Sequence, residues 1–296
     1  MSFLNNVITG ISLGSIYAII ALGYTMVYGI AKMLNFAHGD VIMVGGYICF
    51  FAMGRFHLPP VVGVLLAVAV CTALGIVIER LAYKPLRAAP SLAVLITAIG
   101  VSYFLQNSAQ ILWGAATKTF TPIVGTVGDS SLELIPGQLS ISYVAILSIV
   151  CCVVVMIALT VFTGRTKMGK AMRACSEDKA AAQLMGINVD ATISMTFAIG
   201  SALAAIAGVL MCSAYPVLSP TTGSMPGIRA FTAAVFGGIG SIPGALLGGV
   251  LLGIIETFGK AYISTDLSDA VVFAVLIVVL LVRPAGLMGK YVPEKV

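Results

Sequence analysis

The sequence predicts an all-α, polytopic membrane protein with about eight transmembrane helices, at least one of them broken or re-entrant. Of its 296 residues, 59% are apolar and only 9% are charged, whereas about 25% of the residues in a typical soluble domain are charged. The charges are also confined to short segments, and residues 1–31 carry none. A water-soluble protein of this length would need a far more polar surface.

Eight apolar stretches define the expected spans, because a helix needs roughly 20 apolar residues to cross the bilayer. Strands of a membrane barrel would alternate polar and apolar side chains, and residues 61–78 do not alternate. The stretch 228–261 is too long for one helix and is interrupted by GGIGSIPG. It is either two short spans or a half-helix followed by a full one. The expected spans are 7–30, 36–54, 61–82, 91–113, 141–163, 193–214, 228–261 and 268–283.

Lysine and arginine residues near the ends of the spans predict the orientation. Lys84 and Arg87 follow the third span, and a larger basic cluster follows the fifth. These clusters are two spans apart, so both lie on one side, which we assign to the cytoplasm. The N-terminus and the loop 114–140, with Asp129 and Glu133, then lie outside. A cytoplasmic C-terminus requires an odd number of crossings, which favours dividing 228–261.

Two pairs of segments resemble each other within the chain. Residues 64–80 and 242–257 both run from small and apolar residues to a glutamate, and residues 35–46 and 226–238 both end in Gly-Gly. An inverted repeat, common in transporters, would produce this pattern, and so would shared membrane composition. Glycines four residues apart, such as Gly10 and Gly14 or Gly249 and Gly253, are expected to let helices pack closely.

Several other functions are disfavoured. The net charge of +5 is explained by basic loops between spans, so we expect no nucleic-acid partner. The six cysteines form no CxxC pair, and His38 has no other histidine nearby, so no metal site is expected. The segment GRTKMGKA (164–171) matches most of a phosphate-binding loop, but Ala171 replaces the hydroxyl residue and an apolar span precedes it. We expect no catalytic site and no cofactor in this chain.

The longest charged insertion, residues 164–192, is expected on the cytoplasmic side. Residues 168–185 favour an amphipathic helix, and Gly186 and Asn188 are typical stop signals. Such a helix could lie on the membrane surface or dock on a protein. Because Glu177, Asp178 and Lys179 mix acidic and basic side chains, a protein partner is favoured over anionic lipid.

Polar residues inside the apolar stretches are candidates for a substrate pathway. The junction of the first two spans holds Asn35, His38 and Asp40, which either line a pathway at a broken helix or form a turn and helix cap. Gln106 and Asn107 interrupt the fourth span and either contact substrate or bridge helices. The candidate pathway residues are Asn35, His38, Gln106, Asn107 and Thr232.

Isolated charges in the spans have two open interpretations each. Arg229 either extends to the outer boundary of the membrane or meets a carboxylate. Glu79 and Glu256 end apolar runs, where they could relay protons, as in a secondary carrier, or form structural ion pairs. For Glu79 the structural interpretation is favoured, since Arg80 is its neighbour.

Longer motifs carry a resemblance to a known family. AAAQLMG (180–186) resembles the E-A-A-x-x-x-G loop of the membrane subunits of ATP-binding-cassette importers, although Ala180 replaces the glutamate. The whole chain resembles the permeases of branched-chain amino acid importers, and its length fits the shorter (LivH-type) of their two homologous subunits. The stretches that carry this resemblance are GSIYAIIALGYTMVYGIAKMLNFAHGD, IERLAYKPLR, GRTKMGKAMRACSEDKAAAQLMGIN and IRAFTAAVFGGIGSIPGALLGG.

The resemblance implies a non-catalytic permease domain, residues 1–296, in the bacterial cytoplasmic (inner) membrane. It implies a second, homologous permease, two ATPase subunits that use ATP and Mg²⁺, and a periplasmic or lipoprotein binding protein that delivers leucine, isoleucine or valine. The loop 164–192 would dock on the ATPases. Its candidate coupling residues are Arg173, Glu177, Asp178, Ala181, Ala182 and Gly186. The alternatives are a related permease for urea, amides or a sugar, and an ion-coupled secondary transporter.

Overall fold

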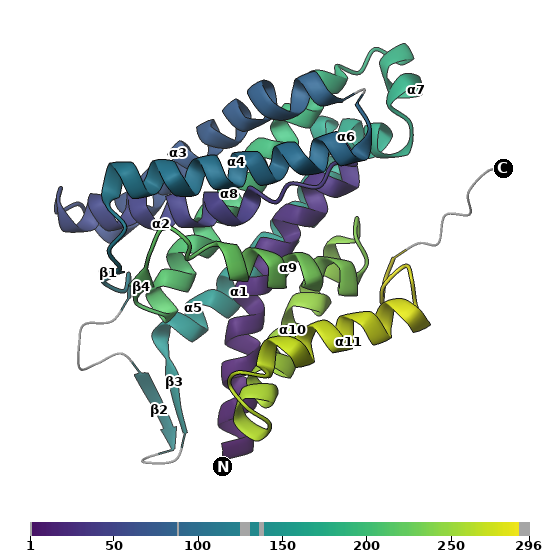
Figure 1. Ribbon diagram of the computed structural model, residues 1–296. Helices are drawn as coiled ribbons and strands as arrows, with labels where there is room; N and C mark the ends of the chain where they lie inside the picture. The colour runs from purple at the N-terminus through teal and green to yellow at the C-terminus, as the bar shows by residue number, and fades with distance from the viewer. Residues whose placement is uncertain (1, 88, 125–130, 136–138, 290–296) are drawn as a thin grey trace.

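The computed structural model describes residues 2–87, 89–124, 131–135 and 139–289, and these residues are mostly helical (Figure 1). The first five helices are α1 (Ser2–Ala31), α2 (His38–Gly54), α3 (Pro60–Ile78), α4 (Ser91–Trp113) and α5 (Tyr143–Arg165). The others are α6 (Lys167–Glu177), α7 (Lys179–Leu184), α8 (Val189–Ala214), α9 (Ser224–Gly237), α10 (Ile242–Tyr262) and α11 (Ser268–Val282). The turns η1 (Glu79–Tyr83, a π-helix) and η2 (Lys84–Leu86, a 3₁₀ helix) follow α3.

The helices confirm that the chain is a polytopic helical membrane protein. Six helices in the described part of the chain are long and apolar enough to cross a membrane: α1, α3 with its extension through Leu86, α4, α5, α8 and α10. The shorter helices α2 and α11 are also apolar. The expected span 91–113 coincides with α4, and the expected span 268–283 ends one residue after α11.

The long stretch expected over 228–261 is a half-helix followed by a full helix. The 14-residue α9 is separated from the 21-residue α10 by residues 238–241. Gly238 and Gly240 have φ angles of +102° and +94°, which glycine adopts without the steric cost that a side chain would add. The chain can therefore turn sharply between the two helices, as the GGIGSIPG sequence predicted.

Helix α1 is the centre of the molecule and packs most extensively against α10. Their backbones approach closely where small residues meet: a Cβ atom added to Gly14 would lie 2.7 Å from the Cα atom of Val250. The same addition at Gly10 would lie 2.9 Å from the Cα atom of Ile254. The predicted role of the spaced glycines in close packing is thereby confirmed.

The described residues also form four short strands. β1 (Lys118–Thr119) pairs with β4 (Val217–Leu218), and β2 (Ser131–Ile135) pairs with β3 (Leu139–Ser142), both antiparallel. β1, β2 and the first half of β3 fall within the loop expected outside over 114–140, where no strand was predicted. Asp129 lies outside the described residues.

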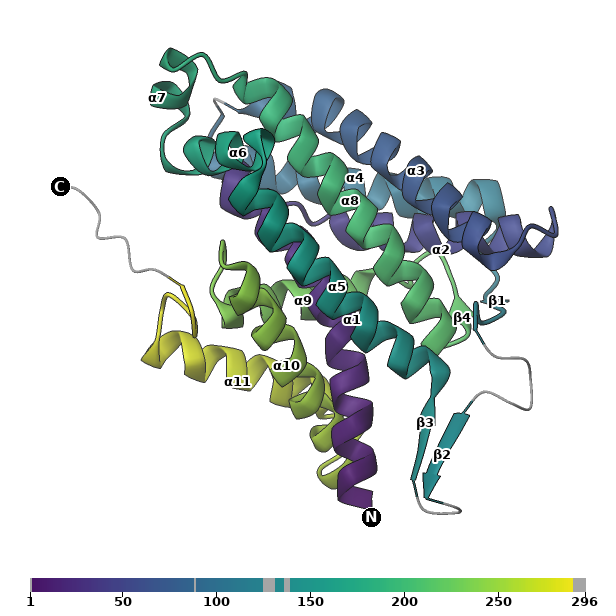
Figure 2. The same cartoon turned by 180° about the vertical axis from the view of Figure 1, so that it is seen from behind.

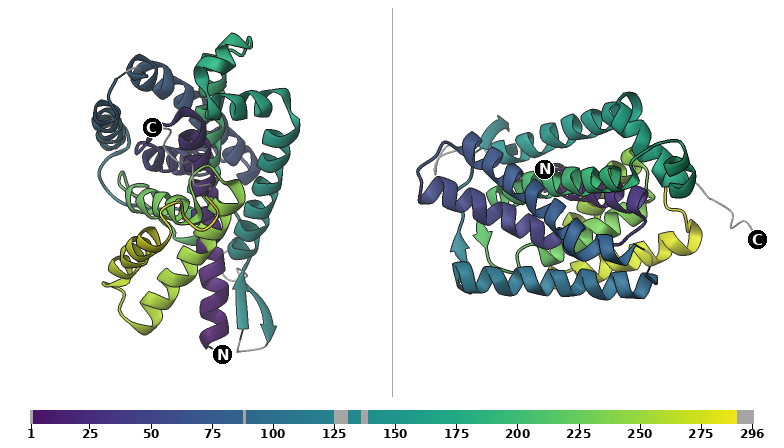
Figure 3. Two further views of the ribbon diagram at one scale, coloured as in Figure 1. Left: turned by 90° about the vertical axis from the view of Figure 1, so that its right-hand side faces the viewer. Right: turned by 90° about the horizontal axis from the view of Figure 1, so that it is seen from above.

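The helices α6 and α7 lie at the opposite end of the molecule from the N-terminus (Figure 1). Figure 1 shows α6, α7 and the end of α1 together, far from the N-terminus and the β2–β3 hairpin. Figure 2 shows α3, α5 and α8 across the face opposite to α4. Seen from above, α4 and α5 lie at opposite edges with α1 between them (Figure 3).

Candidate functional site

The charged segment between α5 and α8 folds as two helices, not as the single helix expected over 168–185. α6 ends at Glu177, and Asp178 has extended backbone angles. Its carboxylate accepts hydrogen bonds from the backbone N–H groups of Ala180 and Ala181, at 2.8 and 3.1 Å. Aspartate is a strong N-cap because it satisfies these free donors, so it starts α7 after a break. We call residues 167–186 the coupling segment.

Helix α6 is fixed to the end of α5 by its apolar face. Met172 and Cys175 are buried, and Gly169 lies directly against the backbone of Phe162 and Thr163, where a side chain would not fit. Gly169, part of the segment that resembles a phosphate-binding loop, therefore serves the packing of α6 on α5. The segment also follows a helix and not a strand. The exposed Arg173 donates to the carbonyl of Gly164 at 3.0 Å, while Glu177 is exposed.

Helix α7 exposes an apolar pair at its tip. Ala182 is buried and Ala181 is exposed, whereas Leu184 and Met185 have exposed fractions of 89% and 82%. Gly186 follows with a φ angle of +80°, a left-handed conformation that commonly ends a helix. The sequence analysis missed Leu184 and Met185 because two apolar residues in a helical pattern are usually core residues.

Lys179 ties α7 to the end of α1. Its ammonium group donates to the carbonyl of Ala31 at 2.8 Å, and this carbonyl belongs to the last turn of α1. Partial burial lowers the pKa of Lys179 below its ordinary value, and the nearby charges of Arg87 and Lys32 lower it further. The coupling segment is thus joined to α5 through α6 and to α1 through α7.

An ion-pair cluster joins the ends of α3 and α8 beside the coupling segment. Arg87 contacts both Glu79 and Asp190, Lys84 pairs with Asp190 at 2.8 Å, and Ser194 donates to Glu79 at 2.6 Å. Glu79 is completely buried. Its role in a structural ion pair is confirmed, but the partner is Arg87, not its neighbour Arg80.

A polar centre forms where α2 and α9 begin. Their backbones touch, since a Cβ atom added to Gly39 would lie 2.7 Å from the carbonyl oxygen of Gly223. The side-chain amide of Gln106, on α4, lies 2.9 Å from the carboxylate of Asp40 and 3.2 Å from the hydroxyl of Ser224. Three helices that are distant in sequence therefore share one hydrogen-bonded cluster.

Two candidate pathway residues lie close to this centre. Asn35 is buried and accepts a hydrogen bond from the hydroxyl of Tyr83 at 2.9 Å. His38 is also buried and lies against Tyr24, with 4.6 Å between the ring centroids. Its Nε2 atom has no hydrogen-bond partner in the described part of the chain.

The other candidates differ in position. Asn107 lies on the exposed face of α4 and donates to the carbonyl of Tyr103 at 2.7 Å. Thr232 is buried in α9 and donates to the carbonyl of Ile228 at 3.0 Å. Gln106 is thus the candidate that joins the polar centre directly, together with Asp40, for which the sequence left a pathway and a helix-cap interpretation open.

A second buried ion cluster lies between α9, α10 and α11. Arg229 pairs with Glu256 at 2.8 Å and with Asp269 at 2.5 Å, and it donates to the hydroxyl of Tyr17 at 3.1 Å. Lys260 also pairs with Glu256 at 2.5 Å. Of the two roles expected for Arg229, the structure shows the contact with a carboxylate. Its partners are two side chains of the same chain, Glu256 and Asp269.

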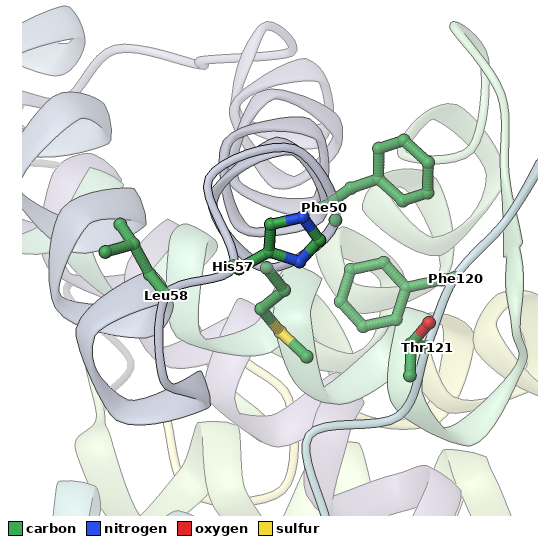
Figure 4. Close-up of a pocket in the computed structure, with 7 residues that line it drawn as sticks. Phe50, His57, Leu58, Phe120 and Thr121 are labelled. Atoms are coloured by element: carbon green, nitrogen blue, oxygen red, sulfur yellow. The ribbon is translucent and has the colours of Figure 1, made fainter.

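A cavity of about 270 Å³ lies at the end of α2 remote from the coupling segment (Figure 4). The labelled side chains come from the end of α2, the turn after it and the segment following β1. The walls are mainly apolar, with one histidine and one threonine. The residues that line it are Phe50, Met53, Gly54, His57, Leu58, Phe120 and Thr121.

Comparison with known proteins identifies the family. The family model described as "Branched-chain amino acid transport system / permease component" matches residues 6–280. The high-affinity branched-chain amino acid transport system permease protein LivH of Salmonella typhimurium is 44% identical, with 99% of this chain and 98% of the relative covered. The corresponding protein BraD of Pseudomonas aeruginosa is 46% identical with the same coverage. A probable LivH of Methanocaldococcus jannaschii is 28% identical over 93% of this chain and 89% of the relative. The chain belongs to the family of branched-chain amino acid transport permease components.

Proposed function

We propose that this chain is a transmembrane subunit of an ATP-driven importer for leucine, isoleucine and valine in a bacterial cytoplasmic membrane. A second, homologous permease completes the pathway, and a binding protein delivers the amino acid. Two separate ATPases drive transport by hydrolysing ATP with Mg²⁺. The observation that carries this proposal is the exposed pair Leu184 and Met185 at the tip of the coupling segment. Apolar side chains exposed on the cytoplasmic side favour a protein partner.

The anchoring of the coupling segment supports its role in transmitting force. α6 packs on α5, and Lys179 holds α7 to the end of α1. Residues 32–37 then lead directly from α1 to the polar centre at the start of α2. Movement of a docked ATPase would therefore reach the membrane helices through two rigid connections, and would switch the pathway between outward and inward access.

The docking is tested by affinity capture of the ATPases on the purified chain. Leu184→Asp and Met185→Asp introduce charge into the apolar contact, and we expect loss of ATPase association with normal membrane insertion. The substitutions Glu177→Lys and Asp178→Lys and deletion of residues 176–186 should act in the same direction. Ile263→Asp is the matched control, since Ile263 is also an exposed apolar residue (62%) but directly follows α10, outside the coupling segment. Retained capture by the Leu184→Asp and Met185→Asp variants would contradict the proposal.

The alternative of an ion-coupled secondary carrier requires a carboxylate that exchanges protons. Glu79 and Glu256 are engaged with basic residues, which does not favour either of them as the relay. Uptake of leucine by the purified chain alone under a proton gradient would establish this alternative. Competition by urea, short amides or a sugar against leucine uptake tests the other substrates.

A further inference from the structure

Three acidic side chains are buried in the part of the chain that the structure describes, and one of them differs from the others. Glu79 pairs with Arg87, and Glu256 pairs with Arg229 and Lys260. Asp40, which is 1% exposed, has no salt bridge within the described residues. An ionised side chain at membrane depth is expensive unless it is paired, and such residues are commonly functional.

Asp40 lies in the first turn of α2 but is not its N-cap residue. The N-cap position is Ala37, whose side chain makes no capping hydrogen bond. The carboxylate of Asp40 instead accepts a hydrogen bond from the neutral amide of Gln106. This amide offers hydrogen bonds without positive charge. The carboxylate of Asp40 therefore has a neutral hydrogen-bond donor but no basic partner among the described residues.

The helix that covers Asp40 is weakly held. α4 packs on α2 and η1, and only 17% of its most apolar 18 residues are buried. Gln106 supplies the polar link from α4 to α2 and α9. Just beyond it, Asn107 and Tyr103 lie on the exposed face of the same helix. A displacement of α4 would therefore open a polar route from this face to Asp40.

We propose that Asp40 binds the ammonium group of the amino acid during its passage, and that Gln106 occupies this position in the closed conformation seen here. This inference rests on the proposed function and adds a selectivity-determining residue to it. A branched-chain amino acid carries an ammonium, a carboxylate and an apolar side chain. A buried carboxylate without a basic partner suits a substrate that carries an ammonium group, such as an amino acid, and not a neutral sugar.

The first test measures leucine uptake per ATP hydrolysed by the assembled transporter in vesicles. Asp40→Asn keeps the size of the side chain and removes its charge, and loss of a charge-assisted hydrogen bond should lower this ratio about tenfold. Asp40→Glu should restore a large part of it. Glu256→Gln is the control, because it also neutralises a buried carboxylate, and we expect it to lower the amount of folded protein without changing the ratio. An unchanged ratio in Asp40→Asn would overturn the inference.

The second test asks whether position 40 is reached from the pathway. Asp40→Cys should react with a positively charged thiosulfonate reagent while the transporter turns over ATP, and leucine should slow that reaction. Ser148→Cys, at a completely buried position in α5, should stay unreactive. Equal reactivity of the two variants, or reaction at position 40 that leucine does not slow, would contradict the inference. Failure of the unmodified transporter to import leucine would instead refute the proposed function.

Discussion

Helices α1 and α4 differ in how much of each is buried by the rest of the chain. Of the most apolar 18 residues in each, 78% are buried in α1 but only 17% in α4. α1 is enclosed by α8, α9, α10 and α5 over most of its length, so its neighbours restrict most of the side chains it can carry. α4 has a free face, and the residues on that face must suit something outside the chain.

The free face of α4 differs from that of α5, which is also mostly unburied. The exposed positions of α5 include a run of aliphatic residues: Ile146, Val150, Val153, Val154, Ile157 and Val161. The exposed face of α4 includes Tyr103, Asn107 and Gln110 among its apolar residues. Lipid suits the first surface, whereas amide groups favour a protein neighbour or an aqueous path. Under the proposed function, this face of α4 would lie against the second permease and the pathway.

The largest effect is expected where helices pack most closely. Gly253→Leu places a side chain into the backbone of α1 at Gly14, and overpacking of this kind should cost more than about 3 kcal/mol and prevent accumulation of folded protein. Gly100→Leu on α4 is the matched control, because nothing lies within 4 Å of an added Cβ atom there. Thermal unfolding in detergent measures both. An equal loss of thermal stability in Gly253→Leu and Gly100→Leu would contradict the close packing of α1 and the free face of α4.

The next effect concerns the buried ion pair between Glu79 and Arg87. Arg87→Ala leaves the completely buried Glu79 without its cation, and this should lower the free energy of unfolding by about 3–5 kcal/mol. Lys84→Ala removes an exposed partner of Asp190 and should cost less than about 1 kcal/mol. A similar cost for both, measured by denaturation in mixed micelles, would show that Glu79 is satisfied by Ser194 and the helix ends.

A reciprocal exchange tests the two free faces directly. Val154→Asn puts an amide on the lipid face of α5 and should destabilise the inserted chain by about 2 kcal/mol. Asn107→Leu should leave stability within about 0.5 kcal/mol but weaken association with the second permease, measured by co-purification. Unchanged co-purification together with normal uptake in Asn107→Leu would mean that α4 faces lipid.

The smallest effect is expected in the coupling segment. Asp178→Ala removes the N-cap of α7 and should cost about 1 kcal/mol locally, seen as faster amide exchange at Ala180 and Ala181. The unfolding of the membrane helices should not change, because α7 contributes little to the core. Unaltered exchange would show that packing of Ala182 alone holds this turn.

Local signals in the sequence predicted much of the fold. The apolar stretch 91–113 became α4 without a change of boundary, and the glycines over 237–244 predicted the break between α9 and α10. The break at Asp178 was missed because the surrounding residues are good helix formers. In that setting a cap and an interior residue look alike.

The contacts of the polar centre could not be predicted in this way. Asp40, Gln106 and Ser224 meet although 66 and 118 residues separate Gln106 from the other two, and only the packing of α2, α4 and α9 brings them together. The partner of Glu79 was misassigned for a similar reason. Arg80 is adjacent in sequence, but the turns η1 and η2 bring Arg87 back to the carboxylate.

Leucine uptake by proteoliposomes that contain this chain, a homologous permease, the ATPases and a binding protein tests the central claim most directly. We predict uptake that requires ATP on the side of the membrane where the ATPases bind. This uptake should disappear in Leu184→Asp and should be retained in Ile263→Asp. Uptake that proceeds without ATPase subunits, driven by a proton gradient across vesicles holding the chain alone, would contradict the account.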